Sequence, residues 1–168
     1  MIKVAVLTIS DKGSKGQRED LSGPVLREGV AQMKGSVVQY EIVPDEKDLI
    51  AARLAAWADS GNVDVILTTG GTGLSARDVT PEATLSIIYR EIPGIAEAMR
   101  AESLKKTPMA MLSRAVAGQR AKCVIINMPG SPKACRECLD VIIPAIPHAI
   151  EIINGVVTEH SDVKAGKK

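Results

Sequence analysis

Aromatic side chains are scarce in this sequence of 168 residues, which has one tryptophan, two tyrosines and no phenylalanine. Charge of one sign is also lacking, because 21 lysines and arginines face 20 aspartates and glutamates and leave a net charge of +1. Few rings leave little surface on which bases can stack, and a balanced charge gives no broad face for a polyanion. We therefore expect no nucleic-acid partner.

Long apolar runs are missing as well. The opening run from Ile2 to Ile9 is too short to span a membrane, and no small-residue cleavage site follows it. We expect no membrane association and a cytoplasmic location. Three cysteines, an odd number, argue against a disulfide framework. Cys135 and Cys138 lie one turn apart on a predicted helix, and we expect them to be packing residues rather than zinc ligands.

The sequence does contain an alternation of apolar runs and amphipathic segments. The apolar runs predict strands at 2–9, 36–43, 63–68 and 123–127. Helical spacing follows at 21–33, 45–61, 81–89, from 93 onward, and at 131–153, where Pro144 and Pro147 should split or kink the helix. Apolar strands that are each followed by a helix predict an α/β fold with a largely parallel sheet covered on both faces.

The length suits a single domain, which we place at residues 1–158. The last ten residues, 159–168, end in AGKK and predict a disordered tail. The segment at 105–118 is assigned to no element.

The most informative segment runs from Val63 to Ala83, where an apolar strand leads into TGGTGLSARDVTPEA. Glycines at 70, 71 and 73 can adopt positive φ and carry no Cβ to hold a ligand away. Backbone N–H groups in such a loop can reach an anion, and phosphate is the usual one. The segment therefore predicts a phosphate-binding loop after a buried strand.

A helix is expected to begin where this loop ends. Thr80 has the character of an N-cap, Pro81 of the first helical residue, and Glu82 of a first-turn acid. Asp78 then lies between a strand and a helix. In an open α/β sheet that position is the carboxyl edge, where ligands bind.

Two familiar phosphate-binding fingerprints do not fit the loop. The match G-x-G-x-x-A from Gly71 to Ala76 should enter its helix at once and belongs on the first strand, whereas residues 77–79 intervene here before Thr80. A P-loop is excluded because no Gly-Lys-Ser/Thr follows the glycines. The loop therefore belongs to another class of anion site.

A second loop, MPGSP at 128–132, also follows a strand and opens a helix, with Ser131 as its cap and Pro132 at its first position. Taken alone, this pattern is also that of an ordinary turn. Together with the first loop, it predicts a nucleotide held between the two.

Three aspartates, Asp11, Asp45 and Asp78, each follow a predicted strand and could converge on one edge of the sheet. Asp45 could instead cap a helix, and Asp78 could bond the amides of its own turn. Two carboxylates about 4 Å apart repel by about 4 kcal/mol at a surface-like dielectric constant. Since a divalent cation removes that repulsion, the pattern predicts Mg²⁺ held by carboxylates and phosphates.

These segments resemble the MogA/MoaB family of molybdenum-cofactor biosynthesis proteins, which also forms a domain of gephyrin and of its plant counterpart. The matching pieces cover almost the whole chain and are LTISD (7–11), VPDE (43–46), TTGGTGLSARDVTPEAT (68–84), LSRAVAG (112–118) and NMPGSPKA (127–134). The resemblance implies a three-layer α/β/α sandwich and a homotrimer. It also implies molybdopterin adenylyltransferase activity, in which ATP and Mg²⁺ serve to transfer AMP to the terminal phosphate of molybdopterin, and a MoeA-like molybdate-inserting enzyme as a partner.

Residue roles follow from the same resemblance. Asp45 and Asp78 fall on the acidic positions of the family, and we predict that they are catalytic and bind the metal. The nucleotide-facing positions are Thr69, Gly70, Gly71, Thr72, Gly73, Pro129, Gly130 and Ser131. The residues assigned to the pterin are Ser10, Asp11, Ser113 and Arg114, of which Arg114 could equally form a surface or intersubunit ion pair.

Other functions stay open at this point. MoaB-type members share several of these motifs, and ACRE after the last loop favours them, whereas VPDE and RDVTPEAT have the MogA-type form that keeps both acids. The two acids favour the adenylyltransferase. The alternatives are a non-catalytic molybdopterin-binding or scaffolding protein of the same fold, and a relative of the competence-damage domain that acts on pyridine-nucleotide derivatives.

Overall fold

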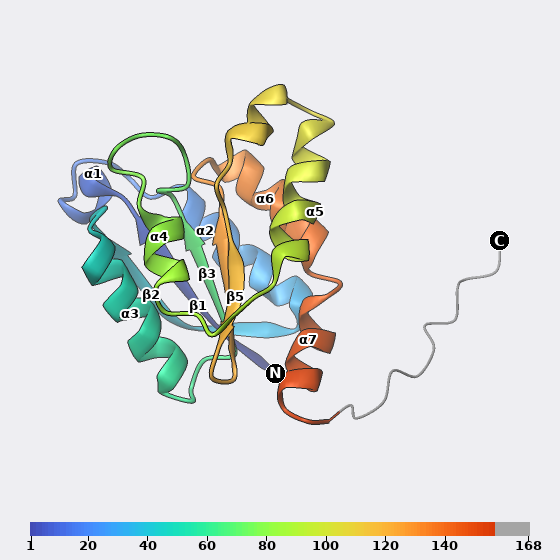
Figure 1. Ribbon diagram of the computed structural model, residues 1–168. Helices are drawn as coiled ribbons and strands as arrows, with labels where there is room; N and C mark the ends of the chain where they lie inside the picture. The colour runs from blue at the N-terminus through green and yellow to red at the C-terminus, as the bar shows by residue number, and fades with distance from the viewer. Residues whose placement is uncertain (157–168) are drawn as a thin grey trace.

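One mixed sheet lies between two layers of helices in the computed structural model, which describes residues 1–156 (Figure 1). The strand order is β2-β1-β3-β6-β5-β4. The strands are β1 (Ile2–Ile9), β2 (Gly35–Val43), β3 (Val65–Thr69), β4 (Arg90–Glu91), β5 (Ala117–Arg120) and β6 (Cys123–Met128). Strands β2, β1, β3 and β6 run parallel to one another. Strand β5 pairs antiparallel with β6, and β4 pairs antiparallel with β5. The predicted α/β fold with a mostly parallel sheet is confirmed.

The helices cover both faces of this sheet. They are α1 (Asp11–Ser14), α2 (Ser22–Val30), η1 (Ala31–Met33), α3 (Lys47–Asp59), α4 (Thr80–Leu85), α5 (Pro93–Leu104), η2 (Pro108–Leu112), α6 (Pro132–Ile142) and α7 (Ile146–Ile153). Helices α3 and α4 pack on one face, and α2, α5, α6 and α7 pack on the other. The result is the three-layer sandwich that the resemblance implied.

Alternation along the strands feeds these two cores. In β1, Val4 and Val6 enter the core under α2 and α6, while Ala5 and Leu7 enter the core under α3. Successive side chains of a strand point to opposite faces, so a central strand buried on both sides must be apolar throughout. The continuous apolar runs of the sequence have this origin.

Two helix ends differ from the prediction. The helix expected at 21–33 ends as α2 at Val30 and continues as the 3-10 turn η1, after which Lys34 adopts the left-handed conformation with φ of 55°. Gly35 instead begins β2 opposite Ile2, where a Cβ would lie 3.1 Å from the Ile2 carbonyl oxygen. The helix predicted to reach Tyr89 ends at Leu85, because the Tyr89 N–H donates to the Gln119 carbonyl at the edge of the sheet.

The rest of the chain completes the frame. The unassigned segment at 105–118 forms η2 and the start of β5, and the predicted break near Pro144 separates α6 from α7. Cys123, Cys135 and Cys138 are buried and free of disulfides, as expected for packing residues. No helix among residues 1–156 is long and apolar enough to cross a membrane. The predicted tail at 159–168 lies outside the described residues, so the domain boundary stays a prediction.

Candidate functional site

The loops that follow three adjacent parallel strands, β1, β3 and β6, meet at the end of the sheet that is uppermost in Figure 1. They surround a cavity of about 490 Å³. Its lining includes Ser10, Asp45, Gly70, Gly71, Asp78 and Gly130. The carboxyl ends of parallel strands carry loops free of ladder hydrogen bonds, which is why open α/β sheets bind ligands there.

We call residues 70–79, between β3 and α4, the glycine loop. Gly70 and Gly71 have φ of 98° and 66°, values that L side chains rarely adopt. A Cβ at Gly70 would collide with the Ile9 carbonyl, and one at Gly71 would collide with the Thr80 hydroxyl. A Cβ at position 73 would lie 2.9 Å from a carboxylate oxygen of Asp78. The glycines are therefore needed so that β1, α4 and an acid can approach the loop closely.

All four carbonyls from Gly70 to Gly73 are bound on the protein side of the loop. Thr80 donates its hydroxyl to the Gly70 oxygen at 2.9 Å and its N–H to the Gly71 oxygen at 3.1 Å. Arg114 donates its N–H to the Thr72 oxygen at 3.0 Å and its Nε to the Gly73 oxygen at 2.7 Å. Within residues 1–156, the N–H groups of residues 71–73 donate to no protein acceptor. The loop thus keeps its donors for a ligand.

The expected N-cap at Thr80 is wrong by one position. The helix begins at Thr80 itself, and Val79 occupies the cap position without a side-chain bond. The Thr80 hydroxyl does not cap because it is bonded to the Gly70 carbonyl. Pro81 and Glu82 lie in the first turn, as predicted.

Asp45 does not cap a helix either, so that expectation is also wrong. Glu46 holds the cap position of α3 without a side-chain bond. The Asp45 carboxylate instead accepts the Asp11 N–H at 2.8 Å, and the Asp11 carboxylate accepts the Asp45 N–H at 3.1 Å. This reciprocal pair ties the loop after β1 to the loop after β2, and it leaves the other Asp45 oxygen beside Gly71.

Asp78 lines the same cavity from the far end of the glycine loop. One of its oxygens accepts the Ser75 N–H at 2.9 Å, and its own N–H donates to the Ser75 carbonyl at 2.9 Å. The carboxylate therefore does bond its own turn, which was the alternative to a ligand role. No hydrogen bond in the described chain uses its second oxygen, so both functions are compatible with this geometry.

Electrostatics link the three acids that the structure brings together. Burial raises the pKa of Asp45, and the negative charges of Asp11 and Asp78 raise it further against the opposing hydrogen bond from Asp11. Asp11 has the opposite shift, since the hydrogen bonds from Arg77 lower its pKa. A nearby positive charge would therefore stabilise the ionised Asp45 carboxylate, whereas Asp11 is already paired with the Arg77 guanidinium.

Arg77 is a member of the site that sequence reasoning missed. Its guanidinium grips both Asp11 oxygens at 2.8 and 3.0 Å and also reaches Glu46 at 3.0 Å. The sequence did contain a signal for this role. Arg77 directly precedes Asp78 on the glycine loop, and the loops after β1 and β2, which end at the same edge of the sheet, carry the acids Asp11 and Glu46. The consequence of these contacts is that each oxygen of the Asp11 carboxylate already accepts a hydrogen bond from the protein.

Asp20 is the second residue that was missed. Its carboxylate accepts the hydroxyls of Thr8 and Tyr40, each at 2.6 Å, and the N–H groups of Ser22 and Gly23 at the start of α2. Burial opposes ionisation, but these four bonds together lower the pKa of Asp20. An aspartate directly before the helix predicted at 21–33 is a recognisable capping signal. Asp20 fixes the segment that forms the outer wall of the cavity.

The loop after β6 forms the opposite wall. Ser131 caps α6, as predicted, by accepting the Ala134 N–H at 3.2 Å. The Pro129 carbonyl accepts the Thr69 hydroxyl at 2.7 Å, and the Gly130 carbonyl accepts the Ser22 hydroxyl at 2.8 Å. Here too the carbonyls are bonded to protein, and Gly130 and Pro132 place the N-terminal end of α6, where the helix dipole is positive, at the first cavity.

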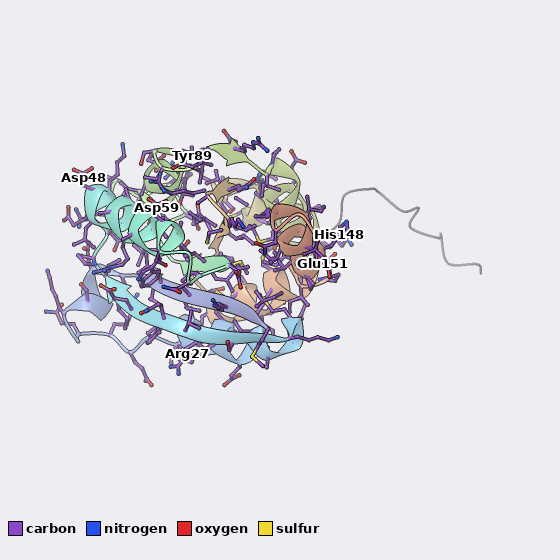
Figure 2. All side chains as sticks on the ribbon, turned by 90° about the horizontal axis from the view of Figure 1, so that it is seen from below. Arg27, Asp48, Asp59, Tyr89, His148 and Glu151 are labelled. Carbon is purple, nitrogen blue, oxygen red and sulfur yellow. The ribbon has the colours of Figure 1, made fainter. Side chains whose placement is uncertain are left out.

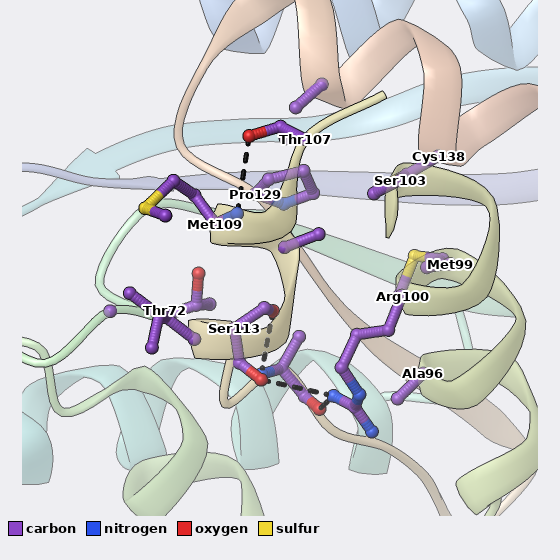
Figure 3. Close-up of a pocket in the computed structure, with 15 residues that line it drawn as sticks. Thr72, Ala96, Met99, Arg100, Ser103, Thr107, Met109, Ser113, Pro129 and Cys138 are labelled. Atoms are coloured by element: carbon purple, nitrogen blue, oxygen red, sulfur yellow. Dashed lines mark hydrogen bonds between the residues drawn. The ribbon is translucent and has the colours of Figure 1, made fainter. Parts of the chain in front are cut away.

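A second, more apolar cavity of about 310 Å³ lies on the other side of the glycine loop (Figure 3). Thr72, Gly73 and Pro129 form the edge nearest the glycine loop and the loop after β6. Arg100 crosses its floor and donates to the Ser113 and Ala115 carbonyls at 3.4 and 2.9 Å. The remaining walls come from α5, η2 and α6, and include Ala96, Met99, Ser103, Met109, Leu112 and Cys138.

The predicted pterin residues are therefore not in one place. Ser10 lines the first cavity and Ser113 lines the second. Asp11 is bound by Arg77 and Asp45, and the Arg114 guanidinium is bonded to Gly73, Asp78 and Glu82. Their roles toward a ligand stay predictions.

The donors suit a magnesium ion that is held largely by phosphates. No group of three or more histidine, cysteine or acidic side chains is arranged around a metal in residues 1–156. Two carboxylates, Asp45 and Asp78, face the same cavity beside free backbone N–H groups. Mg²⁺ is commonly held by one or two carboxylates, with phosphate oxygens and water completing its octahedron.

Known proteins resemble this chain over most of its length. Residues 5–148 match a family model described as "Probable molybdopterin binding domain". A protein of Helicobacter pylori named molybdopterin adenylyltransferase is 47% identical over 92% of this chain and 89% of its own length. The crystal structure of the molybdopterin biosynthesis enzyme MoaB of Thermus thermophilus is 50% identical, covers 92% of this chain and 98% of its own, and has a TM-score of 0.87. A structure of MogA is 37% identical, with coverages of 90% and 99% and a TM-score of 0.85.

The opposite shifts at Asp45 and Asp20 predict opposite effects on stability. The pKa of Asp45 is raised in the folded protein above its ordinary value of 3.8. The protonated carboxyl therefore stabilises the fold at a pH below 3.8, and this contribution is lost as the pH rises through the folded-state pKa. Asp45→Asn should therefore increase the free energy of unfolding at about pH 7 and have little effect at about pH 3. A lowered pKa reverses the sign, so Asp20→Asn should destabilise at about pH 7, and its effect should shrink in acid.

Urea unfolding of both variants at the two pH values measures these differences. Destabilisation by Asp45→Asn at neutral pH would contradict the view that Asp45 is held ionised at a cost to the fold.

Proposed function

This chain belongs to the molybdopterin-binding domain family, and we propose that it is a molybdopterin adenylyltransferase of molybdenum-cofactor biosynthesis. In this reaction, AMP passes from ATP to the terminal phosphate of molybdopterin, and pyrophosphate leaves. The observation that carries the proposal is a loop with its N–H groups free, placed beside two carboxylates in one cavity. Such a site binds a polyphosphate together with a cation.

We assign the first cavity to the phosphates of ATP. Gly70 and Gly71 line one side of it, and Gly130 and Pro132, at the start of α6, line the other. The free N–H groups of Thr72 and Gly73 follow at the edge of the second cavity. Both the glycine loop and the start of α6 supply partial positive charge without a mobile side chain. Thr69, which lines this cavity, joins the two loops by donating its hydroxyl to the Pro129 carbonyl.

We assign the cation to Asp45 and Asp78. When bound, Mg²⁺ would neutralise charge on the triphosphate and on the leaving pyrophosphate. Asp45 is suited to the role because its pKa is raised by burial and by its acidic neighbours, a cost that a cation removes. The bond from the Asp11 N–H holds one oxygen of Asp45 in place and leaves the other toward Gly71.

The reaction needs no general base from the chain. An oxygen of the terminal phosphate of molybdopterin is already an anion, and it attacks the α-phosphorus as the bond from that phosphorus to the β-phosphate oxygen breaks. The electron pair of the broken bond leaves with pyrophosphate. The task of the protein is to align two anions that repel one another, which is work for fixed dipoles and charges.

We assign the pterin ring to the second cavity, beside Ser113. Its walls are largely apolar, and its edge at Thr72 and Gly73 is shared with the loop that we assign to the phosphates (Figure 3). Ser10, on the first cavity, would then lie toward the phosphate end of the pterin substrate.

We further propose that the chain is a homotrimer, as its resemblance implied. Support comes from α5 and η2, which carry four large apolar side chains that are exposed in the single chain: Leu104, Met109, Met111 and Leu112. Its adenylylated product would pass to a MoeA-like enzyme that inserts molybdate. We place the reaction in the cytoplasm, in keeping with three free cysteines.

The trimer proposal predicts a mass near three times 17.8 kDa in light scattering. Met111→Lys should reduce that mass, because it places a charge in a contact that must exclude water. Val38→Lys, which charges an exposed apolar position on β2, should leave it unchanged. A wild-type mass of a single chain would contradict the proposal.

The mechanism predicts that Asp45→Asn combined with Asp78→Asn lowers the rate of pyrophosphate release from ATP and molybdopterin at least about a hundredfold. Asn keeps the shape of each side chain and removes the charge that would hold the cation. Asp48→Asn is the matched control, since Asp48 lies on the outer surface of α3 (Figure 2) and should leave the rate unchanged.

Full turnover by the double variant would contradict the assignment of the two acids. Binding of molybdopterin by the wild type without any pyrophosphate release would instead favour a non-catalytic pterin-binding protein.

A further inference from the structure

We propose that Arg114 is a positioning residue for the nucleotide, which acts by fixing the glycine loop from its protein side. The inference rests on the proposed function, and it changes the part that the sequence suggested for Arg114, which was contact with the pterin. Three nitrogens of its guanidinium are bonded within the protein, so its forked head is already occupied.

The Arg114 guanidinium contacts both ends of the segment 73–78 of the glycine loop. Nε donates to the Gly73 carbonyl at 2.7 Å, and Nη2 donates to the Asp78 carbonyl at 2.6 Å. Nη1 pairs with Glu82 in the first turn of α4. The side chain therefore joins the point where the chain leaves the glycines, the point where it reaches the predicted metal ligand, and the helix that follows.

The main chain of Arg114 adds a fourth tie, because its N–H donates to the Thr72 carbonyl at 3.0 Å. One residue thus accounts for two of the four carbonyls that are turned away from the ligand side at Gly70 to Gly73. Thr80 accounts for the other two. Without the guanidinium, the Gly73 carbonyl would lose its donor and could rotate into the space where a phosphate is expected.

Only the planar fork of arginine meets this demand. A guanidinium presents donors in fixed directions and can bond two carbonyls and a carboxylate at once, whereas an ammonium is a compact charge with three rotating donors. The neighbouring main chain is also held from the second cavity, where Arg100 donates to the Ser113 and Ala115 carbonyls. The segment between the two cavities is thus pinned by one arginine on each side.

The test is the binding of α,β-methylene-ATP with Mg²⁺, measured by calorimetry on the whole chain with no pterin present. Arg114→Gln should weaken this binding at least about tenfold, since it removes hydrogen bonds made by a charged donor. In turnover, the same variant should raise KM for ATP more than KM for molybdopterin. Direct contact with the pterin predicts the reverse pattern, with unchanged affinity for the ATP analogue.

Arg120→Gln is the matched control. Arg120 also donates to a carboxylate, that of Asp59, and to a main-chain carbonyl, that of Ile87. These contacts, and the Tyr89 ring beneath Arg120, lie at the end of the molecule that faces the viewer in Figure 2, where Asp59 and Tyr89 are labelled. It should lose a comparable set of bonds and keep its affinity for the analogue within about twofold, which separates a local effect from general loosening.

If Arg114→Gln shows no cooperative thermal unfolding, the same affinity for the ATP analogue is measured on Arg114→Lys instead. It keeps the charge and the main-chain bond but loses the fork, so weakening of at least about threefold is expected. Affinity equal to that of the wild type in either variant would overturn the inference. Absence of analogue binding by the wild type would count against the proposed function itself, which distinguishes the two failures.

Discussion

The hydrogen bonds that hold the four carbonyls of Gly70 to Gly73 are the constraint on which the rest of the site depends. A peptide group cannot present its N–H and its C=O to the same side, so fixing the carbonyls leaves the donors for a ligand. Thr80 and Arg114 supply these bonds, and the left-handed conformations of Gly70 and Gly71 allow them. The parallel strands then bring this loop beside the acids and the start of α6.

Charge is arranged around this loop at some cost to the fold. Asp45 is partly buried near two other carboxylates, and Arg77 neutralises Asp11 rather than Asp45. The negative charge of Asp45, which is predicted to bind the metal, is thus left without an arginine bonded to it. Stability given up at a binding site is commonly recovered when the ligand arrives, because a cation that binds only the folded state stabilises it.

Sequence reasoning predicted the layers and the sheet because burial on both faces leaves an unmistakable pattern, as in β1, β3 and β6. It also predicted the edge at which Asp11, Asp45 and Asp78 meet, since each follows a strand. It failed where one polar group had to choose among partners. Thr80 and Asp45 have the local character of helix caps, but the Gly70 carbonyl and the Asp11 N–H bind them instead. Arg77 was missed and Arg114 was given another role, because both act through contacts distant in sequence.

Amide NMR of the ¹⁵N-labelled protein, titrated with α,β-methylene-ATP and Mg²⁺, tests the central claim most directly. The free N–H groups of Gly71, Thr72 and Gly73 should show the largest shift changes as they bond to phosphate. Gly61, which has a similar positive φ of 69° but open space around it, should not move. Binding of the analogue with no change at residues 71–73 would contradict the account, because the phosphates would then be held elsewhere.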